Sequence, residues 1–460
     1  MMLRTDKMAE TIESLQYRVE DLSNALAASE RNRRDLADRL NMAEWRYHAT
    51  TTTRAWRMAV LLADCKQAFL PRGTWRFALV RKLYRLVTNL LPRQRTSMNQ
   101  RDPEWNQWLK RLDGSKRPII FLPSVPWSMT LFQRPQHLAR AFARLGHPTF
   151  YNCNGTSEPL EGVHEIEPNL YLFKGSVARL RELRESILWT FTYNFTQKLD
   201  YAADAETVYD WIDDLSVFPY DQTMLKRAHV RALREATMVT CVARCLHDTA
   251  TRTRPDALYL PNAVEFDRFA DDDVAVPDDL TIQDWLDRPG PVIGYYGALA
   301  SWFDYNLLHA VAQRRPDWRF LLIGPDYDRS IHGQSIMSQP NVRWLGPRPY
   351  PSLPQYLKMM DVTMIPFVIN DITLATSPLK LYEYLAAGKP VIATPMPECQ
   401  AHPQVRIART ADEFIAHLDP ALHDSRSAEF RAQVRQVGAD NSWDARARTA
   451  LEQIIPKANR

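Results

Sequence analysis

Residues 377–394 read SPLKLYEYLAAGKPVIAT and combine the signals of a helix with those of a strand. Ser377 is a residue type that caps helix starts, and Pro378 fits a first helical turn, where its missing N–H costs nothing. Gly388 can adopt the left-handed conformation that ends a helix. Residues 390–394 then have the apolar character of a strand. The stretch therefore predicts a short helix with defined ends that leads directly into a buried strand.

Two charged residues interrupt this otherwise apolar helix. Lys380 and Glu383 are three positions apart and so share one edge. Lys380 lies in the first turn, where the helix dipole disfavours a cation by roughly 0.3–1 kcal/mol. A phosphate would satisfy it together with free backbone N–H groups, and Glu383 could accept hydrogen bonds from a ribose diol. The alternative is an ion pair between the two side chains on a solvated edge.

This segment resembles the nucleotide-sugar signature of GT-B glycosyltransferases, especially bacterial polysaccharide-assembly enzymes, in which it reads NPxKLxEYLAxGKPVV. The resemblance implies donor-binding roles for Ser377, Lys380, Leu381 and Glu383. In the large retaining family a further Glu precedes the second one with seven residues between. That position is Ala375 here, and Asp371 is the nearest upstream acid.

Length and composition describe a globular protein. The 460 residues, 45% of them hydrophobic, are enough for two or three domains. The five cysteines are odd in number and form no CxxC pair, so neither a disulfide framework nor a zinc site is indicated, and a reducing cytosol is expected. No apolar run approaches the roughly 18 residues of a spanning helix, and the start lacks a signal peptide. We expect a cytoplasmic protein.

Residues 1–50 carry the heptad pattern of a coiled coil. Mostly apolar residues recur at alternating steps of four and three from Met8 to Tyr47, over more than five heptads, with Ser29 and Arg33 weakening the middle. Ile12 at an a position and Leu15 at a d position are typical of a parallel dimer. We therefore expect a homodimer. The alternative is a helix folded back on its own chain.

Residues 51–95 hold ten Lys or Arg against one acid, Asp64, although the net charge of the whole chain is only +4. These basic residues alternate with Trp, Phe and Leu, the composition of amphipathic helices that lie on an anionic bilayer. This local charge favours a peripheral contact with the inner face of the cell membrane, and general nucleic-acid binding is not expected. Packing against the protein's own surface is the alternative. The polar residues up to 116 complete this second segment as a linker.

The region 117–265 has the alternating pattern of an α/β domain. PIIFLPS, residues 118–124, suits a buried parallel strand, and a helix is expected from about Arg134 through Leu145. The dinucleotide fingerprint, the Walker loop and HExxH are absent from the sequence. LFQRPQHLARAFARLGH is similar to the opening unit of the same glycosyltransferases, which implies an acceptor domain. By that resemblance, cleft positions are expected for Arg134, Gln136 and His137, with a structural histidine as the alternative for the last.

Paired acids end the next motif, VYDWIDDLSVF at 208–218. The resemblance places cleft residues there, so Asp213 and Asp214 are candidate catalytic residues together with His137. Adjacent acids after a strand are also ordinary helix-start residues, which is the alternative.

The region 266–436 restarts the α/β pattern with PVIGYYGAL, in which the Gly297 loop lets a diphosphate approach the backbone. The resemblance places the base near the loops after Gly324 and Gly346, with Arg348 assisting Lys380. Asp326 and Asp328 imitate the metal motif of unrelated GT-A enzymes, and we interpret that as coincidence. Residues 437–460 have the look of a C-terminal helix that crosses back to the first domain.

Together these features predict an α/β, GT-B fold: two Rossmann-like doubly wound domains facing across a cleft, preceded by a coiled coil. The resemblance implies a retaining, hexosyltransferase-class glycosyltransferase that uses a UDP- or GDP-sugar without a metal. Its acceptor would be a lipid-linked sugar or a polysaccharide in surface-glycan assembly. A non-catalytic GT-B membrane scaffold and a sugar-nucleotide epimerase remain the alternatives.

Overall fold

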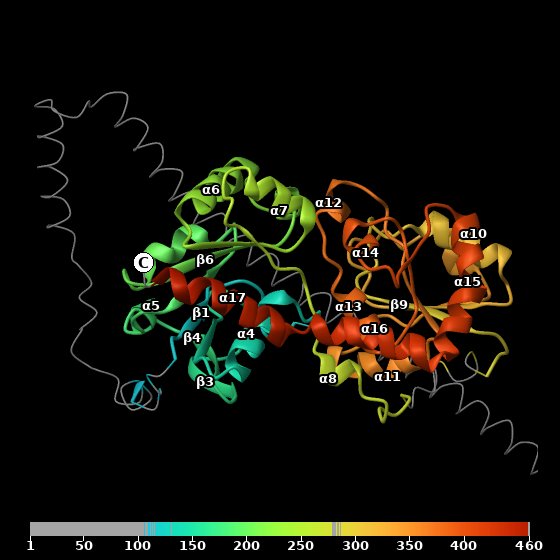
Figure 1. Ribbon diagram of the computed structural model, residues 1–460, viewed down its shortest axis with the longest axis horizontal. Coiled ribbons are helices and arrows are strands. Elements are labelled where there is room, and N and C mark those ends of the chain that lie inside the picture. The colour runs from blue at the N-terminus through green and yellow to red at the C-terminus, as the bar shows by residue number, and fades with distance from the viewer. Residues whose placement is uncertain are drawn as a thin grey trace, which may run out of the picture. The chain divides into compact units, whose positions relative to one another are not determined.

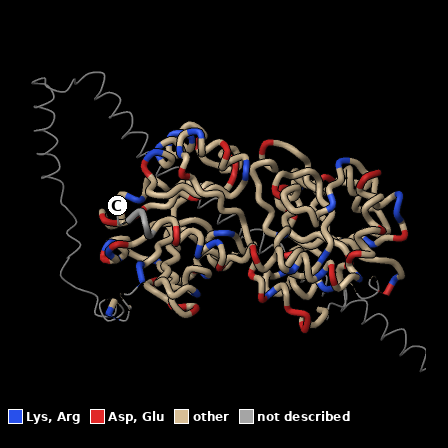
Figure 2. Tube along the Cα trace, in the orientation of Figure 1, with Lys and Arg blue, Asp and Glu red and all other residues tan. Residues whose placement is uncertain are grey.

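The computed structural model describes residues 116–129, 131–277 and 287–458, together with a few single residues: Trp105, Leu109, Lys110, Leu112, Gly114, Ile282 and Trp285. The coiled coil expected at 1–50 and the basic segment expected at 51–95 lie outside these residues. The described elements form two α/β domains, each built on its own sheet (Figure 1). Basic and acidic residues are interspersed over both of them (Figure 2).

The first domain contains an eight-stranded sheet in the order β3-β4-β2-β1-β5-β6-β7-β8. Its strands are β1 Ile119–Phe121, β2 Thr149–Asn152, β3 Gly162–Glu167, β4 Leu170–Lys174, β5 Ile187–Thr190, β6 Glu206–Trp211, β7 Met238–Cys241 and β8 Leu258–Tyr259. The described pairs are parallel except β3–β4, which is antiparallel. In the centre, Ile120 lies between Phe150 and Leu188, and all three are buried. Continuous apolar strands of this kind are expected where helices cover both faces of a parallel sheet.

Helices connect these strands and close the domain. They are α4 Arg134–Arg144, α5 Val177–Leu180, α6 Gln222–Glu235 and α7 Arg244–Thr251, with short 3₁₀ turns η1 Phe195–Asp200 and η2 Leu215–Val217. The helix predicted from Arg134 is confirmed, with Leu145 as its C-cap. The last helix of the chain, α17 Trp443–Ala458, packs on α4, and Trp443 belongs to the same core as Phe142. The C-terminal segment is therefore part of the first domain's core.

The second domain contains a six-stranded parallel sheet in the order β11-β10-β9-β12-β13-β14. Its strands are β9 Val292–Tyr296, β10 Arg319–Ile323, β11 Val342–Trp344, β12 Val362–Ile365, β13 Val391–Ala393 and β14 Arg406–Ile407. The chain builds outward from β9 on one side and then returns to its other side with β12. The strand order thus reverses between β9 and β12, and in open α/β sheets ligands bind beyond the carboxyl ends of the strands at such a point.

The helices of this domain are α8 Phe266–Phe269, α10 Tyr305–Arg314, α11 Leu353–Lys358, α12 Asp371–Leu374, α13 Leu379–Ala386, α14 Pro397–Gln400, α15 Ala411–Arg426 and α16 Ala428–Asp440, with η3 Ser335–Ser338 and η4 Tyr350–Ser352. Helix α16 lies directly against α13. A side chain at Gly438 would come within 2.6 Å of the Ala386 Cα atom, so only glycine permits this close packing. Among the residues that the structure describes, every helix is too short or too polar to span a bilayer.

Polar contacts join the two domains. The Glu398 carboxylate of α14 is buried and accepts hydrogen bonds from the Arg244 backbone N–H, at 2.8 Å, and from the Tyr259 hydroxyl. The Asn262 side-chain amide donates to the Ser377 carbonyl at 2.6 Å. A buried carboxylate is costly unless its oxygens are satisfied, and these donors satisfy Glu398 from the opposite domain.

Candidate active site

Helix α13 ends as predicted but begins later. Gly388 has a φ of +73°, and its N–H and that of Lys389 donate to Leu385 and Tyr384, a Schellman C-terminus. The predicted N-cap, Ser377, is wrong: Pro378 occupies the cap position without any side-chain hydrogen bond. The Ser377 hydroxyl instead accepts from the Asn262 N–H at 3.2 Å. A residue that precedes proline is held away from helical geometry, which leaves its side chain available for this contact between domains.

Lys380 projects from the first turn of α13 toward the point where the strand order reverses. Its ammonium lies over the rings of Tyr295, at 5.1 Å from the centroid, and Phe367, at 4.9 Å. A side chain at Gly297 would meet the Lys380 Cε atom at 2.7 Å. Burial lowers the pKa of Lys380 to about 8, against the opposing effect of Glu383. Within the described residues the ammonium has no hydrogen-bonded or ion-paired partner.

Glu383 lies one turn further along α13 and is only 3% exposed. The Tyr296 hydroxyl donates to its Oε2 atom at 2.8 Å. Burial raises the pKa of the Glu383 carboxyl to about 7, although the Tyr296 hydrogen bond and Lys380 oppose this. The carboxyl is thus held inside the domain beside a tyrosine hydroxyl, and the solvated ion pair with Lys380 considered from the sequence is not what the structure has.

Two glycines hold the loops after β9 and β10 together. Gly297 and Gly324 have φ angles of +137° and +142°. A side chain at Gly324 would come within 1.8 Å of the Gly297 carbonyl oxygen, so neither position accommodates a larger residue. This pair brings backbone within reach of the Lys380 ammonium, which is the arrangement that a diphosphate needs.

The two other expected donor residues are engaged elsewhere. The Arg348 guanidinium donates to the Tyr356 hydroxyl at 2.8 Å and to the Leu345 carbonyl at 2.6 Å. Leu381 is fully buried in the core, and its N–H donates to the Pro378 carbonyl. The structure therefore brings Gly297, Gly324 and Lys380 together, and it gives Arg348 and Leu381 structural contacts.

Arg134 forms a buried ion pair. Its guanidinium donates to both carboxylate oxygens of Asp210, at 2.8 and 3.0 Å, and to the Asn262 side chain at 3.3 Å. Trp189 and Thr240 donate to the same carboxylate. A bidentate pair with further hydrogen bonds is the geometry in which a buried charge is tolerated.

Gln136 ties the start of α4 to the loop that precedes it. Its Oε1 atom accepts from the Gln133 N–H at 2.7 Å, and its amide donates to the carbonyls of Pro126 and Trp127. These contacts complete a capping box. They also give the side-chain amide of Gln136, which is entirely buried, hydrogen-bond partners for both its oxygen and its nitrogen.

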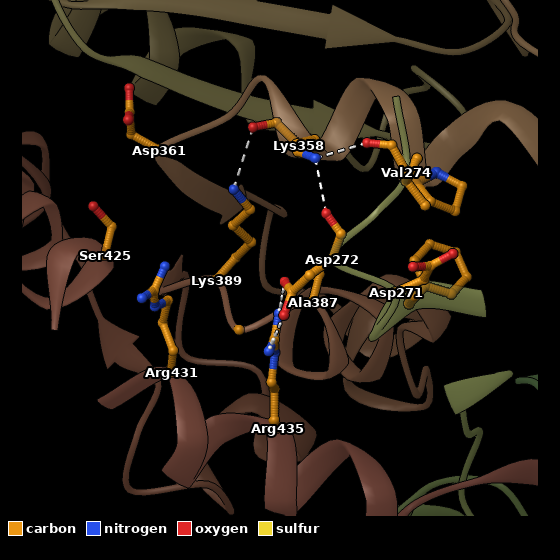
Figure 3. A pocket seen from close by; sticks show the side chains of 13 residues that line it. Asp271, Asp272, Val274, Lys358, Asp361, Ala387, Lys389, Ser425, Arg431 and Arg435 are labelled. Atoms are coloured by element: carbon orange, nitrogen blue, oxygen red, sulfur yellow. Dashed lines mark hydrogen bonds and ion pairs between the residues drawn. The ribbon is translucent and has the colours of Figure 1, made fainter. Parts of the chain in front are cut away.

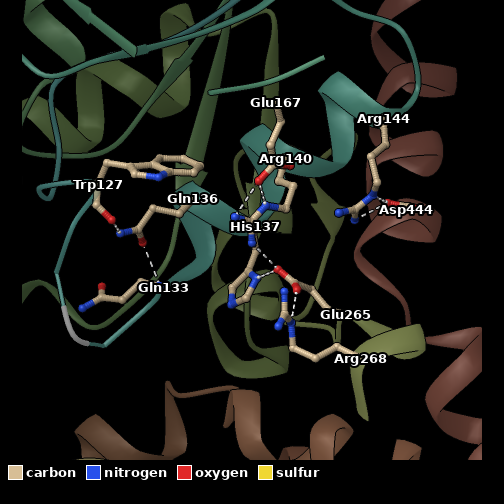
Figure 4. A network of polar contacts seen from close by, with 10 residues as sticks. All are labelled: Trp127, Gln133, Gln136, His137, Arg140, Arg144, Glu167, Glu265, Arg268 and Asp444. Atoms are coloured by element: carbon tan, nitrogen blue, oxygen red, sulfur yellow. Dashed lines mark hydrogen bonds and ion pairs between the residues drawn. The ribbon is translucent and has the colours of Figure 1, made fainter. Parts of the chain in front are cut away.

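His137 belongs to a network centred on Glu265 (Figure 4). The His137 Nδ1 atom lies 3.1 Å from a Glu265 oxygen, and Arg140 and Arg268 donate to the same carboxylate at 2.8 and 2.7 Å. Burial alone would raise the pKa of Glu265, but the His137 hydrogen bond and the arginines hold it well below its usual range. Burial lowers the pKa of His137, whose ring stacks on Trp443 at 5.0 Å. The imidazole thus connects α4, the segment between the domains, and α17.

Asp213 and Asp214 follow β6 and have different surroundings. Asp214 caps η2 and accepts from the Ser216 N–H at 2.8 Å. Asp213 is half-buried, and its carboxylate has no hydrogen-bond donor among the described residues. Burial, reinforced by Asp214 and opposed by Arg134, raises the pKa of Asp213 to about 7. A carboxyl of this kind can donate or accept a proton near neutral pH.

Three residues that complete these clusters were not predicted from the sequence. Tyr296 binds Glu383, Asp210 pairs with Arg134, and Glu398 joins the domains. Tyr296 stands immediately before Gly297 in the motif PVIGYYGAL. Its position at the end of a predicted strand could therefore have marked it as a candidate site residue. Asp210 and Glu398 are ordinary acids in the sequence and become recognisable only through their partners.

The second domain of the chain matches a known family model. Residues 290–424 match the family model described as glycosyl transferases group 1. The chain is 27% identical over 243 residues to the proposed teichuronic acid biosynthesis glycosyltransferase TuaH of Bacillus subtilis (strain 168); the match covers 51% of this chain and 60% of that relative's length.

Two solved structures share the fold. One is the HepE protein of Anabaena in complex with UDP, with a TM-score of 0.55, 14% identity, and coverage of 74% of this chain and all of that one. The other is sucrose-phosphate synthase from Thermosynechococcus elongatus, with a TM-score of 0.53, 16% identity, and coverage of 74% and 99%. Residues 290–424 therefore resemble the group 1 glycosyltransferases, the chain is similar to TuaH over part of its length, and its described domains share the fold of these two solved structures.

Proposed function

We propose that the protein transfers a sugar from a nucleotide-diphosphate sugar to a glycan or lipid-linked acceptor in surface-glycan assembly. The observation that carries this proposal is the Lys380 ammonium, which lies beside Gly297 without an anionic partner among the described residues. An uncompensated cation at the reversal of strand order is suited to a diphosphate leaving group. No metal is required for that role, because the ammonium and backbone N–H groups can neutralise the developing charge.

The other side chains take supporting roles in this proposal. The Glu383 carboxylate accepts hydrogen bonds from the ribose once donor binding displaces or realigns the Tyr296 hydroxyl. Asp213, with a pKa of about 7, binds and orients the acceptor hydroxyl from the first domain. The HepE structures with UDP and with UDP-glucose favour UDP-sugars as the first donors to test.

Donor turnover tests the proposal directly. Purified full-length protein is incubated with a panel of UDP- and GDP-sugars, with and without a lipid-linked or oligosaccharide acceptor, and products are separated by mass spectrometry. Transfer that requires the acceptor supports the proposal. Conversion of the donor without an acceptor would indicate an epimerase, and nucleotide binding without any turnover would indicate a scaffold.

Binding to anionic membranes through residues 51–95 and dimerisation through residues 1–50 are further parts of this proposal. Their support is the charge and heptad pattern of the sequence. A coiled coil next to a basic segment would hold two catalytic units at a membrane that carries a lipid-linked acceptor. Light scattering on the full-length protein and on a variant without residues 1–50 tests the dimer: a monomeric full-length protein would contradict it.

A further inference from the structure

A surface cavity of about 190 Å³ lies in the second domain, lined by the residues that follow α13 and so at the opposite end of that helix from Lys380. Figure 3 shows this cavity from close by. It is enclosed by the segment after α8, the end of α11, the residues that follow α13, and α16. Binding sites for drug-sized ligands usually measure about 300–1,000 Å³. This cavity is too small for a nucleotide sugar and has room for a small ion or phosphate ester.

Four cations and three acids line the cavity, and each acid already has a partner; the third acid, Asp271, accepts from the Asp273 backbone N–H at 2.9 Å. Arg435 forms an ion pair with Asp272. Asp361 accepts from the Val292 backbone N–H at 2.8 Å. The Lys358 ammonium donates to the backbone carbonyls of Asp272 and Val274, at 2.9 and 2.7 Å. These contacts fix the wall but leave its positive charge only partly compensated.

Two donors lack partners among the described residues. The Arg431 guanidinium has no hydrogen bond or ion pair with any described residue. Figure 3 shows this guanidinium directed toward the space between Ser425 and Lys389. The Arg435 Nε atom is buried without a hydrogen bond. A buried donor that is unsatisfied in a native structure calls for an explanation such as a bound ion.

Lys389 completes the cationic side of the cavity. Its ammonium donates to the Met360 carbonyl at 2.6 Å and to the Lys358 carbonyl at 3.5 Å, which leaves one N–H group available. Burial lowers the pKa of Lys389 to about 8; the nearby charges of Arg431, Arg435 and Lys358 act in the same direction, and Asp361 opposes them. An anion between these side chains would relieve this repulsion.

We propose that this cavity binds a free phosphate group, either inorganic phosphate or a small phosphate monoester. The Arg431 guanidinium offers the paired N–H groups that match two phosphate oxygens, and Lys389 supplies a second positive charge. The dianion suits a site where several cations converge better than a singly charged carboxylate does. This inference is independent of the glycosyltransferase proposal, because the cavity shares no side chain with the site around Lys380.

Calorimetry with inorganic phosphate, followed by glycerol 3-phosphate, tests the proposal on the full-length protein. We expect saturable binding that weakens about tenfold or more in Arg431→Gln, the loss of a charge-assisted hydrogen-bonded contact. Arg431→Lys should retain part of the affinity. Arg431 is exposed, so neither change disturbs the core. Tighter binding of glycerol 3-phosphate than of phosphate would identify the monoester as the occupant, and the reverse would identify the free ion.

Two control variants separate this cavity from other phosphate sites. Arg448→Gln removes an exposed arginine of α17 and should leave phosphate binding unchanged. Lys380→Met removes the cation beside Gly297 and should also leave it unchanged. No phosphate binding to the wild-type protein, equal binding to the wild type and Arg431→Gln, or loss of binding only in Lys380→Met would each overturn the proposal.

Discussion

Arg134 in the first domain and Lys380 in the second are both cations largely withdrawn from solvent, but their surroundings differ. Arg134 has a bidentate carboxylate partner in Asp210, and that carboxylate is itself held by two further donors. Lys380 has aromatic rings and a glycine loop around it. The difference between Arg134 and Lys380 shows that the burial of a charged side chain does not by itself mark a functional site. The informative feature is a buried charge that has no partner among the residues that the structure describes.

The largest effect is expected when the complete pair is broken. Arg134→Met leaves the Asp210 carboxylate buried without its cation and should destabilise the fold by about 3–5 kcal/mol. Urea denaturation followed by circular dichroism measures this change. The matched control is Lys380→Met, which removes a cation without an ion pair among the described residues and should leave the free energy of unfolding unchanged or higher. Equal losses of stability in the two variants would remove the distinction between them.

Lys380→Met should instead reduce function. If the ammonium stabilises the leaving diphosphate, the rate of sugar transfer should fall by a factor that corresponds to about 2.7–4 kcal/mol, the effect of removing one preorganised donor. Steady-state kinetics with the donor identified by turnover measures it. Lys226→Met, at an exposed position of α6, is the control, and it should leave both the transfer rate and the free energy of unfolding unchanged. An unchanged transfer rate in Lys380→Met would contradict the leaving-group role.

A smaller effect is expected at Glu383. Glu383→Ala should weaken nucleotide binding by about 1.5–3 kcal/mol, the usual loss for a hydrogen bond to a charged group. The same change leaves the Tyr296 hydroxyl without its acceptor, so some stability should also be lost while the fold persists. Calorimetry with UDP, with Glu383→Gln as the isosteric comparison, measures the binding term. Unchanged affinity in the alanine variant would end the ribose assignment.

Lys380 should also give nucleotide binding an unusual pH dependence. Its pKa of about 8 means that the free protein loses this positive charge as the pH rises above 8. UDP affinity should therefore decline by up to about tenfold per pH unit until the pKa of the lysine in the complex is reached. Because this pKa is lowered by folding, the stability of the unliganded protein should rise over the same window. Lys380→Met should abolish both trends, and a persistent decline in the variant would assign them to another group.

The smallest effect per residue is expected for the cations at 51–95, whose partner would lie outside the protein. Each Lys or Arg near an anionic bilayer contributes about 1 kcal/mol, and inserted Trp and Phe would add a part that resists salt. Sedimentation with anionic vesicles should show binding that weakens as salt rises and disappears when residues 51–95 are deleted. Equal binding to neutral vesicles, or none to either kind, would place the segment against the protein's own surface.

The sequence by itself determined the features that depend on neighbouring residues. Apolar runs in the order strand, helix, strand predicted a parallel α/β architecture, and Gly388 and Gly297 marked positions that only glycine occupies easily. Lys380 was recognisable because an isolated cation in the first turn of an apolar helix is locally unfavourable. These conclusions needed no knowledge of what lies opposite each side chain.

The tertiary structure alone decided which polar groups are satisfied. Arg134 pairs with Asp210 across 76 residues, Tyr296 donates to Glu383 across 87, and Asn262 engages Ser377 across 115. A hydrogen bond fixes the direction and distance of two groups but imposes no pattern on the residues between them, so the sequence contains no periodicity from which such a pair can be found. For that reason only the structure shows that Arg134, expected in the cleft, pairs with Asp210, while Lys380 has no such partner among the described residues.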